Sequence, residues 1–233
     1  MEYRQLHGWD VTPREAIEIQ RQLRAQLITR DLDRTAFRSI AGMDVSYDRR
    51  SPWLFAAIVV LRLADGHLIE SVGIRARARF PYIPGLLSFR ESPAGLEAWE
   101  RLRTRPDCLI CDGHGYAHPR RFGFACHFGL WVNLPTIGCA KSVLVGGFDP
   151  PGVARGSRTD LVDAGEVVGT AVRTRAGAAP VFVSVGHRIS LETAAATVLA
   201  CSTGFRIPEP IRRAHALVTR LRQAGTARAS RGA

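Results

Sequence analysis

The pattern of apolar and polar positions separates predicted strands from predicted helices along the chain. Apolar runs of strand length predict β-structure, and apolar residues spaced three or four apart behind a capping residue predict helices. In the first half, Thr12 followed by Pro13 predicts a helix start, and the turn at 64–66 predicts that the strands on either side pair antiparallel. The elements predicted here are a helix over 13–29 and strands over 39–47, 54–63 and 67–75.

Helices and strands alternate in the second half. Ser92 and Pro93 predict the start of a helix through Leu102. The short apolar strand at 107–111 precedes a helix and another strand, which predicts a parallel pair joined by a right-handed crossover. Ser190 predicts the N-cap of a later helix. The remaining predictions are helices over 121–133, 191–201 and from Pro208 onward, and strands over 136–140, 166–174 and 181–185.

This order of elements predicts an α/β fold with a ribonuclease H-like mixed sheet, in which three antiparallel strands precede parallel α/β units and helices flank the sheet. We expect one domain over 1–223 and a disordered basic tail over 224–233. In such a sheet the first strand lies beside the fourth, so Asp44 faces Asp112. A carboxylate inside a sheet is unfavourable unless it is paired or bound to a cation, which favours a shared metal ion.

The segment 112–121 combines groups that suit a metal ion and a phosphate. Its sequence, DGHGYAHPRR, follows a short apolar strand, so a carboxylate and two imidazoles lie where a rigid element ends. Asp112 offers the hard oxygen that Mg²⁺ prefers, and Gly113 allows close approach of the backbone. The arginine pair that ends the segment suits bidentate contacts to phosphate.

Charge and composition favour a polyanionic partner. The formal net charge is +11, and Lys141 is the only lysine, so arginine carries nearly all of the excess. A genome rich in arginine codons explains the arginine-to-lysine ratio but not the size of the charge. No apolar run is long enough to cross a bilayer and the N-terminus has no signal-peptide core, so we expect a cytoplasmic protein without a membrane partner. Five cysteines, including Cys108 and Cys111, are predicted to be buried thiols.

Several segments, taken in order, are similar to the motifs of the endonuclease V family, the deoxyinosine 3′ endonucleases. The resemblance covers about residues 13–220, and the combination of motifs is highly specific. The matching segments are IAGMDVSY at 40–47, PYIPGLLSFRE at 81–91, DGHG at 112–115, HPRRFG at 118–123, GCAKS at 138–142, GHRISLE at 186–192 and RIPEP at 206–210.

The resemblance implies a Mg²⁺-dependent repair endonuclease that nicks a strand at the second phosphodiester bond 3′ to a deaminated base, chiefly hypoxanthine, leaving 3′-hydroxyl and 5′-phosphate ends. Mn²⁺ is expected to substitute for Mg²⁺. The resemblance makes Asp44, Glu91 and Asp112 the acidic site, with Asp44 and Asp112 as metal ligands. Tyr82 matches a wedge that fills the gap in the base stack, and its flanking prolines fix the backbone, so little entropy is lost on insertion.

Further roles follow from residue chemistry. Lys141 is expected to hold the phosphate or orient the nucleophilic water, and His118 to bind a second ion through water or to assist proton transfer. Gly85 and Gly113 are expected to offer backbone hydrogen bonds to the extruded base. The expected DNA contacts also include Pro81, Ile83, Pro84, Arg90, Arg120 and Arg121.

Two other functions remain open on the sequence alone. One is a nucleic-acid-binding protein without activity, although carboxylates that repel phosphate would not help it. The other is a structure-selective nuclease of the junction-resolving type on the same sheet. Glu91 would otherwise be only a helix-dipole partner and Tyr82 a loop residue. We expect a monomer that acts on damaged DNA, and inosine-containing RNA remains an alternative substrate.

Overall fold

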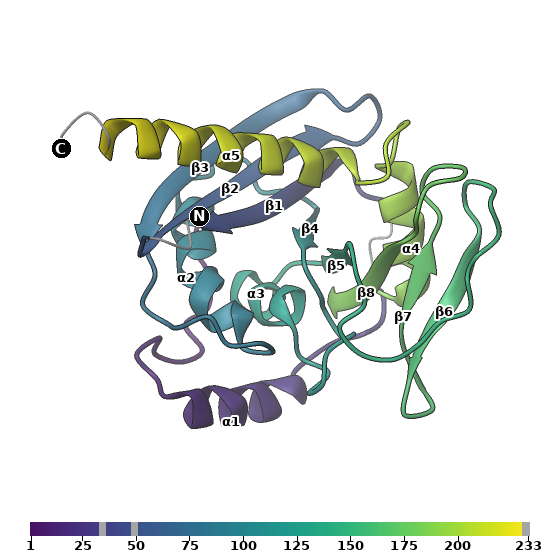
Figure 1. Cartoon of the computed structure of the whole chain (residues 1–233), viewed down its shortest axis with the longest axis horizontal. Helices are drawn as coiled ribbons and strands as arrows, with labels where there is room; N and C mark the ends of the chain where they lie inside the picture. The colour runs from purple at the N-terminus through teal and green to yellow at the C-terminus, as the bar shows by residue number, and fades with distance from the viewer. Residues whose placement is uncertain (33–35, 48–50, 230–233) are drawn as a thin grey trace.

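The computed structural model describes residues 1–32, 36–47 and 51–229. Its centre is an eight-stranded mixed sheet in the order β3-β2-β1-β4-β5-β8-β7-β6 (Figure 1). The predicted adjacency is confirmed, because β1 pairs antiparallel with β2 and parallel with β4. The strands are β1 Ser39–Tyr47, β2 Trp53–Arg62, β3 Leu68–Arg77, β4 Cys108–Asp112, β5 Thr136–Ala140, β6 Arg158–Asp163, β7 Glu166–Val172 and β8 Val181–His187.

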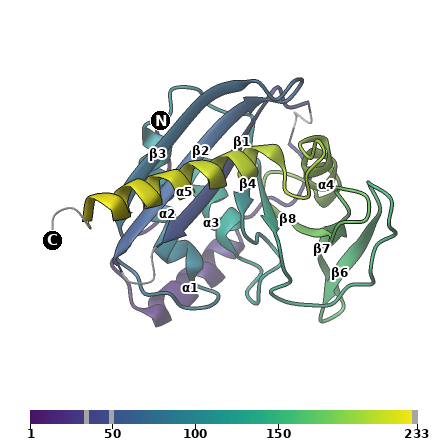
Figure 2. The ribbon, with the colours of Figure 1, turned by 45° about the horizontal axis from the view of Figure 1, so that its top comes forward.

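Helices cover both faces of the sheet. On one face α2 and α3 pack against a core that includes Met43 and Trp99, and on the other α4 and α5 pack against a core that includes Ile40 and Ile110. Figure 2 shows α5 lying across β1 and β2. The helices are α1 Pro13–Arg24, α2 Leu87–Glu100, α3 Phe124–Val132, α4 Leu191–Ala200 and α5 Glu209–Ala229.

The predicted helix caps are confirmed at two helices. Thr12 accepts a hydrogen bond from the backbone N–H of Glu15, whose side chain bonds back to the Thr12 N–H, so both ends of a capping box are present. Ser190 caps α4 by accepting from the N–H of Thr193. The first helix ends at Arg24, five residues before the predicted end at 29.

The predicted start of α2 was wrong. This helix begins at Leu87 rather than at Ser92, and Pro93 lies inside it. Proline removes only one intrahelical hydrogen bond, and burial of the side chains of Phe89 and Trp99 offsets that loss. As a result Glu91 belongs to the helix interior and is not a residue preceding its cap.

Two elements at the edges of the fold also differ from the prediction. Strand β6 was missed because its sequence, RTDLVD, is largely polar and only Leu161 is buried. Helix α5 continues to Ala229, past the predicted boundary at 223. The rest of the predicted tail, 230–233, lies outside the described residues.

Close packing at Gly42 fixes α5 against β1. A Cβ atom at this position would overlap the backbone of Pro210 and Ile211, where α5 begins. The absence of a side chain therefore lets the helix rest directly on the strand. This contact is structurally important because α5 carries His215, which bonds to Asp44 on the same strand.

We expect Gly42→Ala to lower the free energy of unfolding by about 3 kcal/mol, since the added methyl group overlaps backbone atoms that cannot rotate away. Urea unfolding of the purified variant measures this. Gly8→Ala is the control, because nothing lies within 4 Å of a Cβ at that position. Equal stability of the Gly42→Ala and Gly8→Ala proteins would contradict the packing argument.

Candidate metal and nucleic-acid site

Three side chains from distant parts of the sequence meet at one end of the sheet. Asp44 lies on β1, Asp112 ends β4 and His215 lies on α5, and one potential ligand atom from each lies within 4.8 Å of the others. His215 Nδ1 is 2.8 Å from Asp44 Oδ2, and Lys141 Nζ is 2.5 Å from Asp112 Oδ2. The predicted approach of Asp44 to Asp112 is therefore confirmed.

Burial makes the Asp44 carboxyl harder to ionise. Desolvation of the Asp44 carboxyl, and then the charge of Asp112, raises its pKa above the usual value, although His215 and Lys141 act in the opposite direction. The buried carboxyl of Glu91 has a pKa well above its usual value, because of burial first and then the charges of Asp44 and Asp112. Oxygen donors that repel one another in a desolvated site suit a hard divalent cation, which would stabilise their charged forms.

His215 was not assigned a role from the sequence. It lies 171 positions from Asp44, and its side chain is 58% exposed, so the imidazole contacts the carboxylate and also reaches solvent. Its importance depends on how α5 crosses the sheet. The one available signal was its position beside the buried stripe of Ile211, Ala214 and Val218, which predicts that this helix packs on the core.

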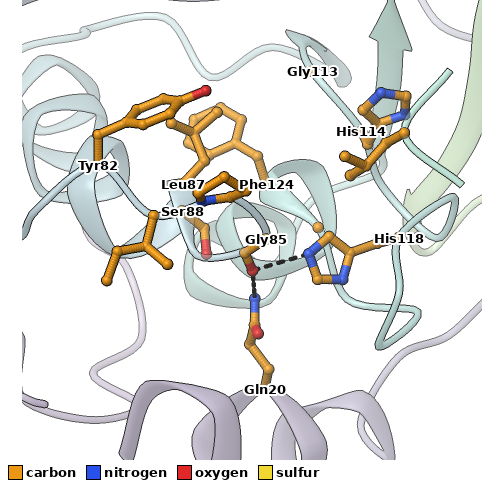
Figure 3. Close-up of a pocket in the computed structure, with 13 residues that line it drawn as sticks. Gln20, Tyr82, Gly85, Leu87, Ser88, Gly113, His114, His118 and Phe124 are labelled. Atoms are coloured by element: carbon orange, nitrogen blue, oxygen red, sulfur yellow. Dashed lines mark hydrogen bonds between the residues drawn. The ribbon is translucent and has the colours of Figure 1, made fainter. Parts of the chain in front are cut away.

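A cavity of about 150 Å³ lies beside Tyr82 (Figure 3). Tyr82 is 56% exposed, and its ring centroid is 5.9 Å from that of Tyr47. The start of α2 contributes to the wall, and no side chain caps the helix there. The lining residues are Gln20, Tyr82, Ile83, Pro84, Gly85, Leu87, Ser88, Gly113, His114, His118, Gly123, Phe124 and Leu144.

Three donors converge on the carbonyl oxygen of Gly85, which has the positive φ of 78° that favours glycine. They are Gln20 Nε2 at 3.0 Å, His118 Nε2 at 3.0 Å and Arg120 Nη2 at 2.6 Å. Gln20 is 1% exposed, accepts from Arg120 Nε and also donates to the carbonyl of Phe122. Helix α1 thereby ties the segment after Tyr82 to the segment after β4.

His118 lies in the wall of this cavity and is not one of the clustered metal-ligand candidates. Its Nε2 donates to Gly85, and its Nδ1 accepts from the backbone N–H of Arg120, so both ring nitrogens are used within the wall. Burial, and then the charge of Arg120, lowers the His118 pKa to about 4. The imidazole is therefore neutral at physiological pH, which fits a positioning role better than the predicted proton transfer or water-mediated metal binding.

The arginines of the motifs are held by protein groups. Arg121 is buried in the left-handed region at φ 55°, and it pairs with Asp163 and Glu166 at 2.7 Å each. It also donates to the backbone carbonyls of His118 and Asp163, so four of its five N–H groups are bonded within the protein. Arg120 holds the cavity wall, and Arg90 donates to the carbonyl of Phe80 at 2.7 Å.

The sheet order and the carboxylates on two neighbouring central strands define the class of protein as a ribonuclease H-like nuclease. A family model described as Endonuclease V matches residues 21–216. An Endonuclease V from Myxococcus xanthus is 51% identical over 216 residues, covering 93% of this chain and 92% of the relative. The chain therefore belongs to the endonuclease V family.

Solved structures agree with this assignment. The crystal structure of Endonuclease V from Streptomyces avermitilis is 42% identical with a TM-score of 0.90, covering 94% of this chain and 96% of that chain. Endonuclease V from Ciona intestinalis, in complex with a 24mer DNA containing an inosine followed by a ribo-adenosine, is 29% identical with a TM-score of 0.82, covering 91% and 98%. In the described part of the chain, no helix has both the length and the apolar character needed to span a membrane.

We expect stability to fall as the pH drops from about 6.5 to 4, because His118 takes up a proton in the unfolded chain before it does so in the folded one. The His118→Gln side chain keeps a donor and an acceptor but does not titrate. Over this pH range its free energy of unfolding should therefore fall by about 3 kcal/mol less than that of the wild type. Thermal unfolding across this pH range measures the difference. His67→Gln, at an exposed position, should follow the wild type; identical pH profiles for His118→Gln and wild type would contradict the assignment.

Proposed function

We propose that this nuclease is a Mg²⁺-dependent DNA repair enzyme that recognises deoxyinosine. In this proposal it nicks the strand at the second phosphodiester bond 3′ to the lesion and leaves 3′-hydroxyl and 5′-phosphate ends. The observation that carries the proposal is the combination of the Asp44–Asp112 carboxylate pair with a cavity beside an exposed tyrosine. A base extruded into the cavity would leave the neighbouring phosphodiester bonds close to the carboxylates.

Asp44 and Asp112 are the proposed ligands of the metal ion, with Glu91 supporting them through its buried carboxyl. When bound, Mg²⁺ supplies Lewis-acid polarisation of the phosphate and lowers the pKa of a bound water. Mn²⁺ has the same preference for oxygen ligands and is expected to substitute. Asp112 would keep Lys141 beside the phosphate, since the ammonium group already contacts its carboxylate.

His215 is proposed to act from α5. Its Nδ1 donates to Asp44 when it carries the proton, which orients the carboxylate, and its other ring nitrogen is available to solvent or substrate. This arrangement can move a proton at the reacting phosphate without disturbing the carboxylate cluster. The role of proton transfer therefore passes from His118, which is fully hydrogen-bonded within the cavity wall, to His215.

The cavity is proposed to hold the extruded base. The N–H of Phe89 donates to the Leu86 carbonyl, whereas Leu87 and Ser88 line the cavity and α2 has no side-chain cap. The backbone N–H groups of Leu87 and Ser88 are therefore the proposed donors to the carbonyl oxygen that distinguishes hypoxanthine from adenine. Close backbone walls would exclude the exocyclic amine of guanine. The hydrogen bonds to the Gly85 carbonyl keep this wall in one position before the base arrives.

The proposal predicts Mg²⁺-dependent nicking of an end-labelled duplex with a single deoxyinosine, mapped to one nucleotide. Asp44→Asn and Asp112→Asn should each lower the single-turnover rate by a factor of about 1,000 or more, because each removes a charged ligand. Asp65→Asn, in an exposed turn, is the control. Cleavage indifferent to inosine would favour a structure-selective nuclease, and tight binding without cleavage would favour a non-catalytic binder.

Tyr82→Ala should weaken binding to an inosine-containing duplex more than to a single-stranded inosine oligonucleotide, since only the duplex has a stacked gap to fill. Loss of one stacking side chain is expected to reduce duplex affinity on the order of tenfold. Fluorescence anisotropy without divalent metal measures both affinities. An equal loss of affinity for the duplex and for the single strand would contradict the proposed wedge role of Tyr82.

A further inference from the structure

Three arginines form a row at the end of the edge strand β3. Arg75 and Arg77 lie in the strand and Arg79 follows it, and all three are exposed. Residues two apart on a strand point to the same face and lie about 6.6 Å apart. None of the three forms an ion pair with any residue in the described ranges of the chain, so their positive charge is uncompensated there. We call Arg75, Arg77 and Arg79 the arginine edge.

Strand register puts Arg75 and Arg77 of the arginine edge on the same face of the sheet as Asp44. Asp44 is aligned with Ala57 and Ala57 with Gly73, so the side chains at 44, 73 and 75 point to one face. Strands β1 and β3 run in the same direction because both are antiparallel to β2, and Figure 1 shows their arrowheads at one end of the sheet. The lateral separation of β1 and β3 is roughly 10 Å.

Helix α5 leaves the arginine edge uncovered. It packs over Gly73, where an added Cβ would meet Leu217 and Leu221, and the next two side chains of that row are exposed. The guanidinium of Arg75 stacks on the ring of Trp53 at 3.8 Å, which holds it in a defined position without neutralising its charge. A linear polyanion bound at the carboxylate cluster could therefore also contact the arginine edge.

We propose that the arginine edge binds the phosphate backbone of the duplex that flanks the lesion. This inference rests on the proposed function, because it assumes that a phosphate of the same duplex lies at Asp44 and Asp112. Duplex DNA fits the arrangement because its phosphates form regularly spaced rows that a row of exposed arginines can contact. The edge also leads directly into Tyr82, the residue proposed to enter the base stack.

The test is the salt dependence of binding to a long inosine-containing duplex in the absence of divalent metal. Replacing all three arginines by alanine should reduce the slope of log K against log salt concentration by about 2.7, which corresponds to three lost phosphate contacts. Affinity near 0.1 M salt should fall on the order of tenfold to a hundredfold. The triple lysine variant should keep most of the slope, because charge rather than side-chain shape is required.

The matched control removes the same charge from the opposite end of the sheet. Arg38, Arg101 and Arg103 are exposed beside the start of β1 and the end of α2, and their triple alanine variant should keep the wild-type slope. An unchanged slope in the edge variant would overturn the proposal, and so would an equal loss in the control, which would indicate a net-charge effect. Thermal unfolding of both variants verifies that they are folded.

Duplex length gives an independent readout. Shortening the DNA on one side of the lesion should abolish the difference between wild type and the edge variant, and shortening it on the other side should not. A difference that survives both truncations would contradict a flank contact. Cleavage at inosine by the wild type is measured in parallel. Absence of cleavage would contradict the proposed function, whereas the salt dependence of binding tests the arginine edge separately.

Discussion

The repulsion between closely spaced carboxyl groups at the end of the sheet is the constraint on which the rest of the site depends. Asp44 and Glu91 are buried, and the charge of the partly exposed Asp112 raises the pKa of both carboxyls further. Apolar packing alone would not hold such groups together. Strands β1 and β4 fix the backbones of Asp44 and Asp112, and helix α2 carries Glu91. Lys141 and His215 supply partial compensation at the rim. The fold therefore holds these carboxyl groups together against their mutual repulsion, and a bound cation would reduce that repulsion.

The second requirement is a rigid wall for the cavity, and helix α1 meets it from outside the sheet. Gln20 is buried with both ends of its amide bonded, and it links the Gly85 carbonyl, Arg120 and the Phe122 carbonyl. A carbonyl that accepts several donors cannot rotate without breaking all of them. Two segments separated by more than thirty positions are therefore linked through one carbonyl oxygen, which fixes the wall of the cavity beside Tyr82.

Much of the fold could be predicted from the sequence, and part of the site could not. Apolar runs and caps predicted β1, β5 and the start of α4 because these elements are decided by local pattern. The approach of Asp44 to Asp112 followed from strand order. The polar strand β6 and the proline inside α2 were missed because tertiary packing decides them. His215 and the partners of Arg121 were missed for the same reason: their contacts come from segments far along the chain.

The positive charge of the chain is divided between two physical tasks. Arg120 and Arg121, which belong to the most specific motif, are bonded to protein groups and shape the cavity wall. Arginines with no motif around them, such as Arg77, remain exposed and uncompensated in the described chain. An arginine that holds a loop needs hydrogen-bond acceptors at defined positions around its guanidinium group. An arginine that attracts phosphate needs only an exposed position on the face where the nucleic acid binds. Sequence motifs therefore identify the scaffold of this site, and attraction for a polyanion must be located from strand register and exposure.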